Sequence, residues 1–242
     1  MKKISILLMF AFCLVVTSAI SQKQLYFGAG FSGLSTWITN QNNYGLPEMD
    51  YKMTFGMAGN ASIGYDFTKN IGLKLEIGYS KLGQSYKDNI NDTAYVRDVK
   101  LYYLQIPLLF KYKTGGEVAR FYFLIGPQFG FLMNAKQSYL KNGDPDENTI
   151  KDLVNNTHKI SEETITSRYT SYDIFARLDL GVDITLVKNL VLNAGLTFNY
   201  GLTDINATDW RIKDSSGNYS ASHNIFGGMN VGLCYVLDFN KK

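Results

Sequence analysis

Eight stretches of the chain alternate apolar and polar side chains residue by residue, which is the period of a β-strand with two different faces. They cover residues 25 to 36, 53 to 67, 71 to 83, 99 to 113, 118 to 134, 171 to 186, 190 to 202 and 222 to 239. In the sixth stretch, Ile174 and Ala176 lie on one face while Asp173 and Arg177 lie on the other. Few stretches have the apolar spacing of an amphipathic helix. The pattern predicts an all-β chain.

The connections between these stretches alternate between long and short. The long ones are polar and cover residues 37 to 52, 84 to 98, 135 to 170 and 203 to 221, whereas tight turns lie near 68 to 70, 114 to 117 and 187 to 189. An even number of strands with every long loop at one end is the layout of outer-membrane barrels. We therefore expect an eight-stranded antiparallel up-and-down transmembrane β-barrel in the outer membrane. Both termini are expected in the periplasm, and the long loops outside the cell.

The N-terminus has the layout of a secretory signal peptide. Lys2 and Lys3 precede an apolar run over residues 4 to 16, and Ala19 and Ser21 occupy the two small positions before a cleavage point. The apolar run is shorter than the roughly 20 residues that a membrane-spanning helix needs. We expect a signal peptide over residues 1 to 21 and a single barrel domain over residues 22 to 242.

Charge argues against nucleic acid as a partner. Lys2 and Lys3 contribute two charges to the formal net charge of +3, so a chain without the leader would carry +1. The remaining charges are scattered along the sequence, without the basic patch that binds nucleic acid.

A soluble lipocalin-like barrel would show the same alternation, but it turns its apolar face inward toward a ligand. Here the apolar face is nearly free of charge and carries aromatic residues toward the strand ends, as at the two interfaces of a membrane. The polar face carries many glycines, which leave room for large polar side chains in a narrow lumen. Arg177 facing lipid near the midplane would cost about 2 to 4 kcal/mol. The apolar face is therefore expected to contact lipid.

Charged and amide side chains on the other face are expected to form a polar network that fills the lumen. Its members are Lys74, Glu76, Gln105, Arg120, Gln128, Asp173, Arg177, Asp179 and Asp183. Buried charges of both signs must pair or remain hydrated. Two pairs are expected, Arg120 with Asp183 and Glu76 with Arg177. The alternative is a narrow path for protons or ions.

The last stretch carries a pattern that resembles the signal read by the barrel-assembly machinery. Asn230, Gly232, Tyr235 and Leu237 match polar-x-Gly-x-x-aromatic-x-apolar. The pattern departs from the usual form because three residues follow Phe239. It predicts the assembly machinery as a partner during biogenesis.

Several strands resemble an outer-membrane β-barrel family common in Bacteroidetes, the PorT-like or porin-family β-barrel domain. Residues 103 to 112, YLQIPLLFKY, resemble the family's Y-x-E-I-P-L-L-x-K-Y, with Gln105 in place of glutamate. Residues 126 to 130, GPQFG, are similar to its G-P-x-x-G, and residues 76 to 80, EIGYS, also match. The resemblance implies the fold and the location. The PorT-like subgroup implies a role in a secretion apparatus, although the matching residues are scaffold positions.

No catalytic, cofactor or metal site is expected. An enzyme of this architecture needs an activated nucleophile, but the only histidines are His158 and His223, with no H-x-S arrangement. Asp144, Asp146 and Glu147 could hold calcium, but a solvated turn is the favoured interpretation of this cluster. The long segment 135 to 170 has room for surface recognition.

We therefore expect a non-enzymatic barrel with a structural, surface-contact or envelope-assembly role, surrounded by outer-membrane lipid and able to bind a protein through its loops. The alternatives are a component of a secretion apparatus and a narrow pore.

Overall fold

The computed structural model describes residues 24–41, 49–90, 93–142, 144–145, 162–213 and 217–238. The expected signal peptide, Asp146, Glu147 and His158 lie outside these residues.

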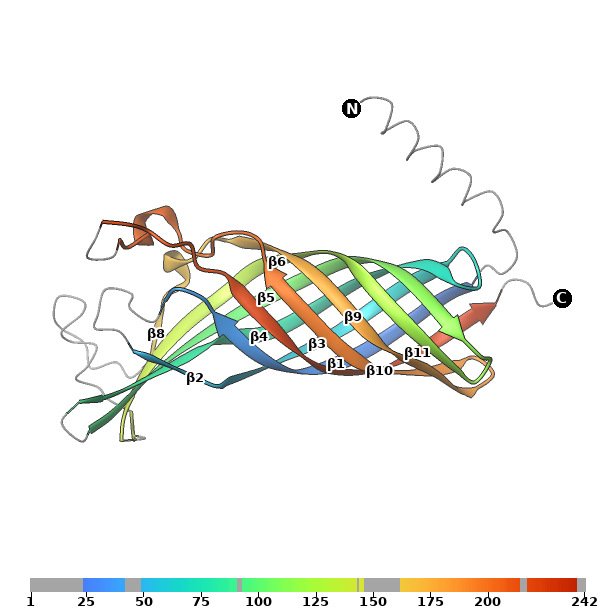
Figure 1. Ribbon diagram of the computed structural model, residues 1–242, viewed down its shortest axis with the longest axis horizontal. Helices are drawn as coiled ribbons and strands as arrows, with labels where there is room; N and C mark the ends of the chain where they lie inside the picture. The colour runs from blue at the N-terminus through green and yellow to red at the C-terminus, as the bar shows by residue number, and fades with distance from the viewer. Residues whose placement is uncertain are drawn as a thin grey trace, which may run out of the picture.

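Eight long antiparallel strands close into a barrel (Figure 1). They are β1 (Gln24–Ile38), β3 (Thr54–Asp66), β4 (Ile71–Ile90), β5 (Thr93–Gly115), β6 (Ala119–Lys141), β9 (Tyr172–Val187), β10 (Leu190–Gly201) and β11 (Asn224–Asp238). Each strand pairs with the next one in this order, and β1 pairs with β11 from end to end. The predicted up-and-down barrel of eight strands is confirmed.

Shorter elements join the barrel at one end. Strand β2 (Asp50–Lys52) pairs with β4, while β7 (Asp144–Pro145) and β8 (Glu162–Thr164) pair with β6. Within the described connections lie the single-turn helices η2 (Thr166–Arg168) and η3 (Thr208–Trp210). No helix among the described residues is long and apolar enough to cross a membrane.

The two ends of the barrel differ, as the connections predicted. Tight turns join β3 to β4, β5 to β6 and β9 to β10 at one end, where the first residue of β1 also pairs with the last residue of β11. We call this the turn end and the opposite one the loop end. In the first turn, the Thr68 hydroxyl accepts hydrogen bonds from the amides of Asn70 and Ile71 at 3.0 and 2.9 Å. Such turns need few residues, because the side chain satisfies the backbone donors.

The outer surface of the barrel is apolar. Exposed side chains include Phe27, Phe31, Phe55, Ile77, Tyr79, Leu108, Phe121, Ile125, Leu180, Leu196, Val231 and Tyr235. Glu76, Gln128 and Arg177, from alternate positions, are buried. A soluble barrel would have these two faces exchanged, so the side-chain placement agrees with the lipid-facing assignment.

Three strands extend further toward the loop end than the sequence pattern predicted. Residues 84 to 98, expected as a loop, instead complete the hairpin of β4 and β5, with pairs from Gln84 and Val99 to Ile90 and Thr93. β6 likewise continues to Lys141. The prediction was wrong because Gln84 and Lys87 are polar on both faces of the hairpin, which removes the alternation of a half-buried strand. We call residues 80–90, 93–101 and 134–141 the strand extension.

A β-bulge at Met133 also alters the pattern. Tyr102 pairs with Asn134, and the next residue of β5, Tyr103, pairs with Leu132. The extra residue moves the inward positions of β6 from even to odd numbers, so Ala135 and Gln137 are buried. A strict period of two cannot be followed through a bulge.

Candidate functional site: the barrel interior

Ion pairs fill the interior near the turn end. Lys113 of β5 lies 2.5 Å from the Asp66 carboxylate of β3, and Lys111 lies 2.9 Å from the Asp183 carboxylate of β9. The Lys111 ammonium also lies 4.7 Å from the centroid of the Tyr26 ring. Each buried lysine thus has a carboxylate partner, as burial of a charge requires.

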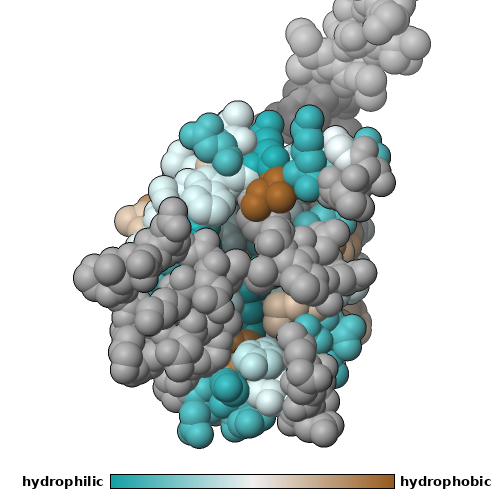
Figure 2. Space-filling view, turned by 90° about the vertical axis from the view of Figure 1, so that its left-hand side faces the viewer, coloured by the Kyte–Doolittle hydropathy of each residue, from teal (hydrophilic) through white to brown (hydrophobic). Residues whose placement is uncertain are grey.

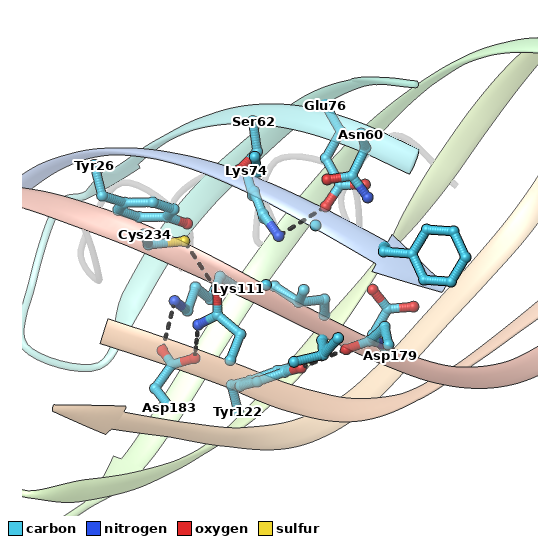
Figure 3. Close-up of a pocket in the computed structure, with 18 of the residues that line it drawn as sticks. Tyr26, Asn60, Ser62, Lys74, Glu76, Lys111, Tyr122, Asp179, Asp183 and Cys234 are labelled. Carbon is cyan, nitrogen blue, oxygen red and sulfur yellow. Dashed lines mark hydrogen bonds and ion pairs between the residues drawn. The ribbon is translucent and has the colours of Figure 1, made fainter. Parts of the chain in front are cut away.

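Arg177 of β9 is the centre of the next layer. Its guanidinium contacts Glu76 at 2.9 Å and Asp179 at 2.8 Å, and it donates a hydrogen bond to the Gln128 side chain at 3.2 Å. Lys74 pairs with the second oxygen of Glu76 at 2.7 Å (Figure 3). The predicted pair of Glu76 with Arg177 is confirmed.

The predicted pair of Arg120 with Asp183 is wrong, although the two residues are opposite each other in the register of β6 and β9. The Arg120 guanidinium donates instead to the Gly116 carbonyl at 3.1 Å. The Asp183 carboxylate accepts hydrogen bonds from the Lys111 ammonium and the Asn193 amide instead. Arg120 lies at the half-exposed turn end, where it needs no carboxylate, whereas the ammonium of Lys111 is buried and does.

Two of the predicted residues, Asp173 and Gln105, make no contact with a buried cation among the described residues. Asp173 belongs to a separate cluster toward the loop end, where it accepts hydrogen bonds from Asn224 at 2.9 Å and from Thr203 at 2.5 Å. Gln105 is buried, and its amide nitrogen has no hydrogen-bond partner. The structure therefore brings together Lys74, Glu76, Gln128, Arg177 and Asp179, and places Asp183 in the adjacent layer. Gln105 lines a small cavity together with Glu76, Gln128 and Arg177. Arg120 and Asp173 lie apart from this group.

An apolar core fills the interior toward the loop end, and the sequence pattern did not predict it. Its buried members include Leu34, Ile38, Leu82, Tyr86, Val99, Leu101, Tyr103, Phe175, Ile205 and Phe226. The Phe175 ring lies 5.3 Å from that of Phe226 and 6.3 Å from that of Tyr103. The sequence around Leu101 and Tyr103 is apolar on both faces, so alternation could not show that one face points inward.

Hydrogen bonds between loops cover this core. The Gln41 side chain, just after β1, donates to Asn206 at 2.6 Å, and Asn206 donates to Tyr219 at 2.9 Å and Ser222 at 3.0 Å. The Tyr219 hydroxyl donates to Asp204 at 2.7 Å, and partial burial raises the pKa of Tyr219 to about 12. These bonds connect the end of β1 to the segment between β10 and β11.

The space left inside is small. One polar cavity of about 40 Å³ lies among Tyr26, Lys74, Glu76, Lys111 and Asp183. A second cavity, of about 20 Å³, lies among Gln105, Gln128 and Asn199. A single water needs roughly 10 to 15 Å³ of such space. These cavities fit a few waters and no larger solute.

The described residues contain no group of three or more histidine, cysteine, aspartate or glutamate side chains placed to hold a metal ion. Asp144, one of the acidic residues considered for calcium, is exposed beside β6.

The residues of the expected assembly signal lie on both faces of β11. Tyr235 and Leu237 are exposed on the outer surface near the turn end. Asn230 faces the interior, where its side chain accepts a hydrogen bond from the Tyr122 hydroxyl at 3.2 Å. Gly232 of β11 is opposite Gly30 of β1.

Comparison with solved structures found outer-membrane proteins of low sequence identity. The structure is similar to Neisserial surface protein A, with 14% identity over 87% of this chain and 96% of that one and a TM-score of 0.44. It is similar to a major outer membrane protein of Thermus thermophilus, with 15% identity over 89% and 99% of the chains and a TM-score of 0.45. It is also similar to the outer membrane protease OmpT of Escherichia coli, with 11% identity over 90% and 97% and a TM-score of 0.40. A comparison with curated proteins finds no match.

The model of one protein family, the outer membrane protein beta-barrel domain, matches residues 16–207. This span includes seven of the eight long strands, all except β11. The chain belongs to the family of outer membrane protein β-barrel domains.

Proposed function

We propose that this protein is a non-enzymatic outer-membrane barrel that serves as a structural and surface-contact protein, with the turn end in the periplasm and the loop end outside the cell. The observation that carries the proposal is the closed interior. Ion pairs, the apolar core and the loop hydrogen bonds lie in series along the barrel. A barrel closed in this way can act through its surface and loops.

The strand extension supports a role in contact. Roughly 9 to 11 residues carry a strand across a bilayer, but β5 and β6 each have 23 residues. The outward side chains of the extension include Lys81, Lys87, Lys100 and Lys136, in contrast to the apolar surface below. Figure 2 looks onto the loop end, where the described residues in view are mostly hydrophilic.

A narrow pore is the alternative that the interior argues against. Purified protein in a planar bilayer is expected to give no steady conductance, because the buried Tyr103, Phe175 and Phe226 rings pack against one another in the interior. Its conductance is compared with that of a Phe175→Ala, Phe226→Ala double variant, which lacks two of these rings. Steady conductance from the unaltered protein would contradict the closed interior.

Surface contact is tested by shortening the hairpin of β4 and β5. Tyr86 and Arg97 are opposite each other, so residues 87 to 96 can be replaced by Asn-Gly, which forms a two-residue hairpin turn. Cross-linking and purification from outer membranes should recover a partner with the full chain and not with the shortened one. The control replaces residues 68 to 70 at the turn end and should keep the partner. Equal recovery by all three chains would exclude the extension as the contact.

The absence of enzymatic activity is part of the proposal. His223 stacks on Tyr200, with ring centroids 5.9 Å apart, and the neighbouring Ser222 hydroxyl accepts a hydrogen bond from Asn206. An activated serine would need its hydroxyl against a base. We expect no loss of acyl chains from outer-membrane lipid incubated with the protein.

Assembly and secretion make separate predictions. Tyr235 and Leu237 project outward near the turn end, which suits contact with lipid and with an assembly machine. Replacing Tyr235 by alanine should lower the amount of barrel in the outer membrane without changing the stability of the refolded protein.

A PorT-like role in a secretion apparatus is the alternative function. It requires that the protein co-purify with that apparatus.

A further inference from the structure

Arg97 is a buried cation on the inner face of the strand extension. It lies between two tyrosines in register, Tyr86 of β4 and Tyr139 of β6. The exposed fractions are 5% for Arg97, 0% for Tyr86 and 6% for Tyr139. The three side chains form one row on the inner face of three neighbouring strands.

The contacts of Arg97 leave most of its hydrogen-bonding capacity unused. One terminal nitrogen donates to the Gln41 carbonyl at 2.7 Å, and the guanidinium lies 4.4 Å from the centroid of the Tyr86 ring. A guanidinium carries five N–H donors. The Arg97 Nε and the Tyr86 hydroxyl are both buried without a hydrogen-bond partner.

No carboxylate among the described residues forms an ion pair with Arg97, in contrast to the buried cations nearer the turn end. Lys111, Lys113 and Arg177 each contact a carboxylate.

The acidic residues near Arg97 that the structure describes do not form an ion pair with it. Glu163 of β8 pairs with Arg168 at 2.8 Å. Asp88, one pair further along the same face of β4, has an interaction of its own but no ion pair with Arg97. Asp98, the next residue in β5, lies on the opposite face.

An uncompensated buried charge is costly, and buried donors almost always have a partner. We propose that Arg97 and Tyr86 form a binding site for an oxyanion, either a carboxylate or a tetrahedral phosphate or sulfate group. The planar guanidinium can donate two parallel hydrogen bonds to such a group, and the Tyr86 hydroxyl can donate a third.

The surroundings of the site favour a ligand that enters from the loop end. Leu82, Leu101 and Tyr103 of the apolar core lie below Arg97 and separate it from the ion pairs nearer the turn end. Tyr139 accepts a hydrogen bond from the Gln137 amide, which leaves its own O–H free to donate. Tyr169, whose hydroxyl donates to the Gln41 side chain at 3.3 Å, joins the same group. The site does not depend on the proposed surface contact, because a free anion would occupy it equally.

The test uses the full folded chain in detergent, titrated with sodium phosphate, sulfate or acetate against sodium chloride at equal ionic strength. A ligand that binds only the folded state raises its thermal stability in proportion to occupancy. We expect a saturable rise in the unfolding midpoint with at least one oxyanion and none with chloride. The comparison of acetate with phosphate and sulfate distinguishes planar from tetrahedral ligands. Broadening of the phosphorus NMR signal reports phosphate binding independently.

Three variants locate the site. Arg97→Gln should weaken binding by about tenfold or more, because it removes the charge and the paired donors. Tyr86→Phe removes only one hydroxyl and should weaken binding by a smaller factor. Arg97→Lys keeps the charge but loses the planar fork, so it should also bind less tightly. The control is Arg211→Gln, which removes a loop arginine paired with Asp204 and should bind as the unaltered protein does.

The proposal fails if the unaltered protein shows no saturable response beyond chloride, or if Tyr86→Phe and Arg97→Lys bind as tightly as it does. These two variants decide the matter even if Arg97→Gln does not fold.

Discussion

Arg177 has more ionic contacts than the buried lysines around it, since it contacts both Glu76 and Asp179 in the barrel interior. Replacing Arg177 by leucine leaves Asp179 without its cationic partner and Glu76 with Lys74 alone. Breaking a buried ion pair on one side typically costs about 3 to 5 kcal/mol. We expect the free energy of unfolding in urea to fall by about that amount.

The control for this change is Arg211→Gln, because Arg211 pairs with Asp204 near the surface. Its unfolding free energy should stay within about 0.5 kcal/mol of the unaltered value. An Arg177→Leu protein of unchanged stability would mean that the ion pairs contribute nothing net to the fold.

Tyr169 lies in the group of hydrogen-bonded residues that covers the interior at the loop end. Burial raises its pKa from 10.0 to about 12, while Arg97 and Arg168 oppose the rise. Because the folded-state pKa is the higher one, the stability that the protonated hydroxyl contributes is complete below about pH 10 and is lost as the pH rises to about 12. A Tyr169→Phe protein should therefore lack one phenolate transition centred near pH 12 in its ultraviolet absorbance. A missing transition centred at pH 10 would show that Tyr169 is solvated.

Single residues also show where prediction from sequence stops. The pairing of Glu76 with Arg177 follows from the face of each strand. Arg120 and Asp183 are equally well placed by face and register, yet they do not pair. Alternation and register decide which backbones are neighbours, whereas side-chain reach and access to water decide which charges meet.

At the scale of strands, inward glycines are explained by the tyrosines that lie across from them. Gly64 of β3 is opposite Tyr26 of β1, and a Cβ atom on Gly64 would overlap the Tyr26 ring. Gly181 of β9 is likewise opposite Tyr122 of β6. A ring that lies flat on a neighbouring strand fills a narrow lumen only where that strand has no side chain.

Gly64→Ala should therefore destabilise the barrel by about 1 to 3 kcal/mol through overpacking. With Tyr26→Ala in the same chain, the loss should be less than the sum of the two single changes by about 0.5 kcal/mol or more. Urea unfolding of the four proteins of this cycle measures the difference. Gly33→Ala is the matched control, since a Cβ there meets nothing within 4 Å. Additive effects of the Gly64 and Tyr26 changes would contradict the packing explanation.

The strands themselves were predictable because lipid on one side and a crowded lumen on the other impose opposite polarity on neighbouring residues. The strand extension could not be predicted in this way, since both faces of a strand can be polar beyond the apolar surface. The bulge at Met133 could not be predicted either, because one extra residue reverses the alternation without changing the composition of the strand.

At the scale of the whole molecule, the interior changes from ionic at the turn end to apolar at the loop end. The apolar part coincides with the start of the strand extension, where Leu82 of β4 and Leu101 of β5 are opposite each other. The barrel therefore has a continuous packed core that runs from the membrane-facing part into the extension. Because buried apolar contacts and paired strands resist local opening, we expect hydrogen exchange in the extension to be slower than in a loop.

The orientation of the molecule is open to a direct test with single cysteines. Asp209 of η3 is exposed at the loop end, and Glu117 is exposed in a turn at the other end. Cys234, the one cysteine in the described residues, is 6% exposed and faces the interior, so it should not react. With the loop end outside, a membrane-impermeant maleimide should label Asp209→Cys in intact cells. Glu117→Cys should become labelled only after the outer membrane is permeabilised, and the reverse pattern would place the strand extension in the periplasm.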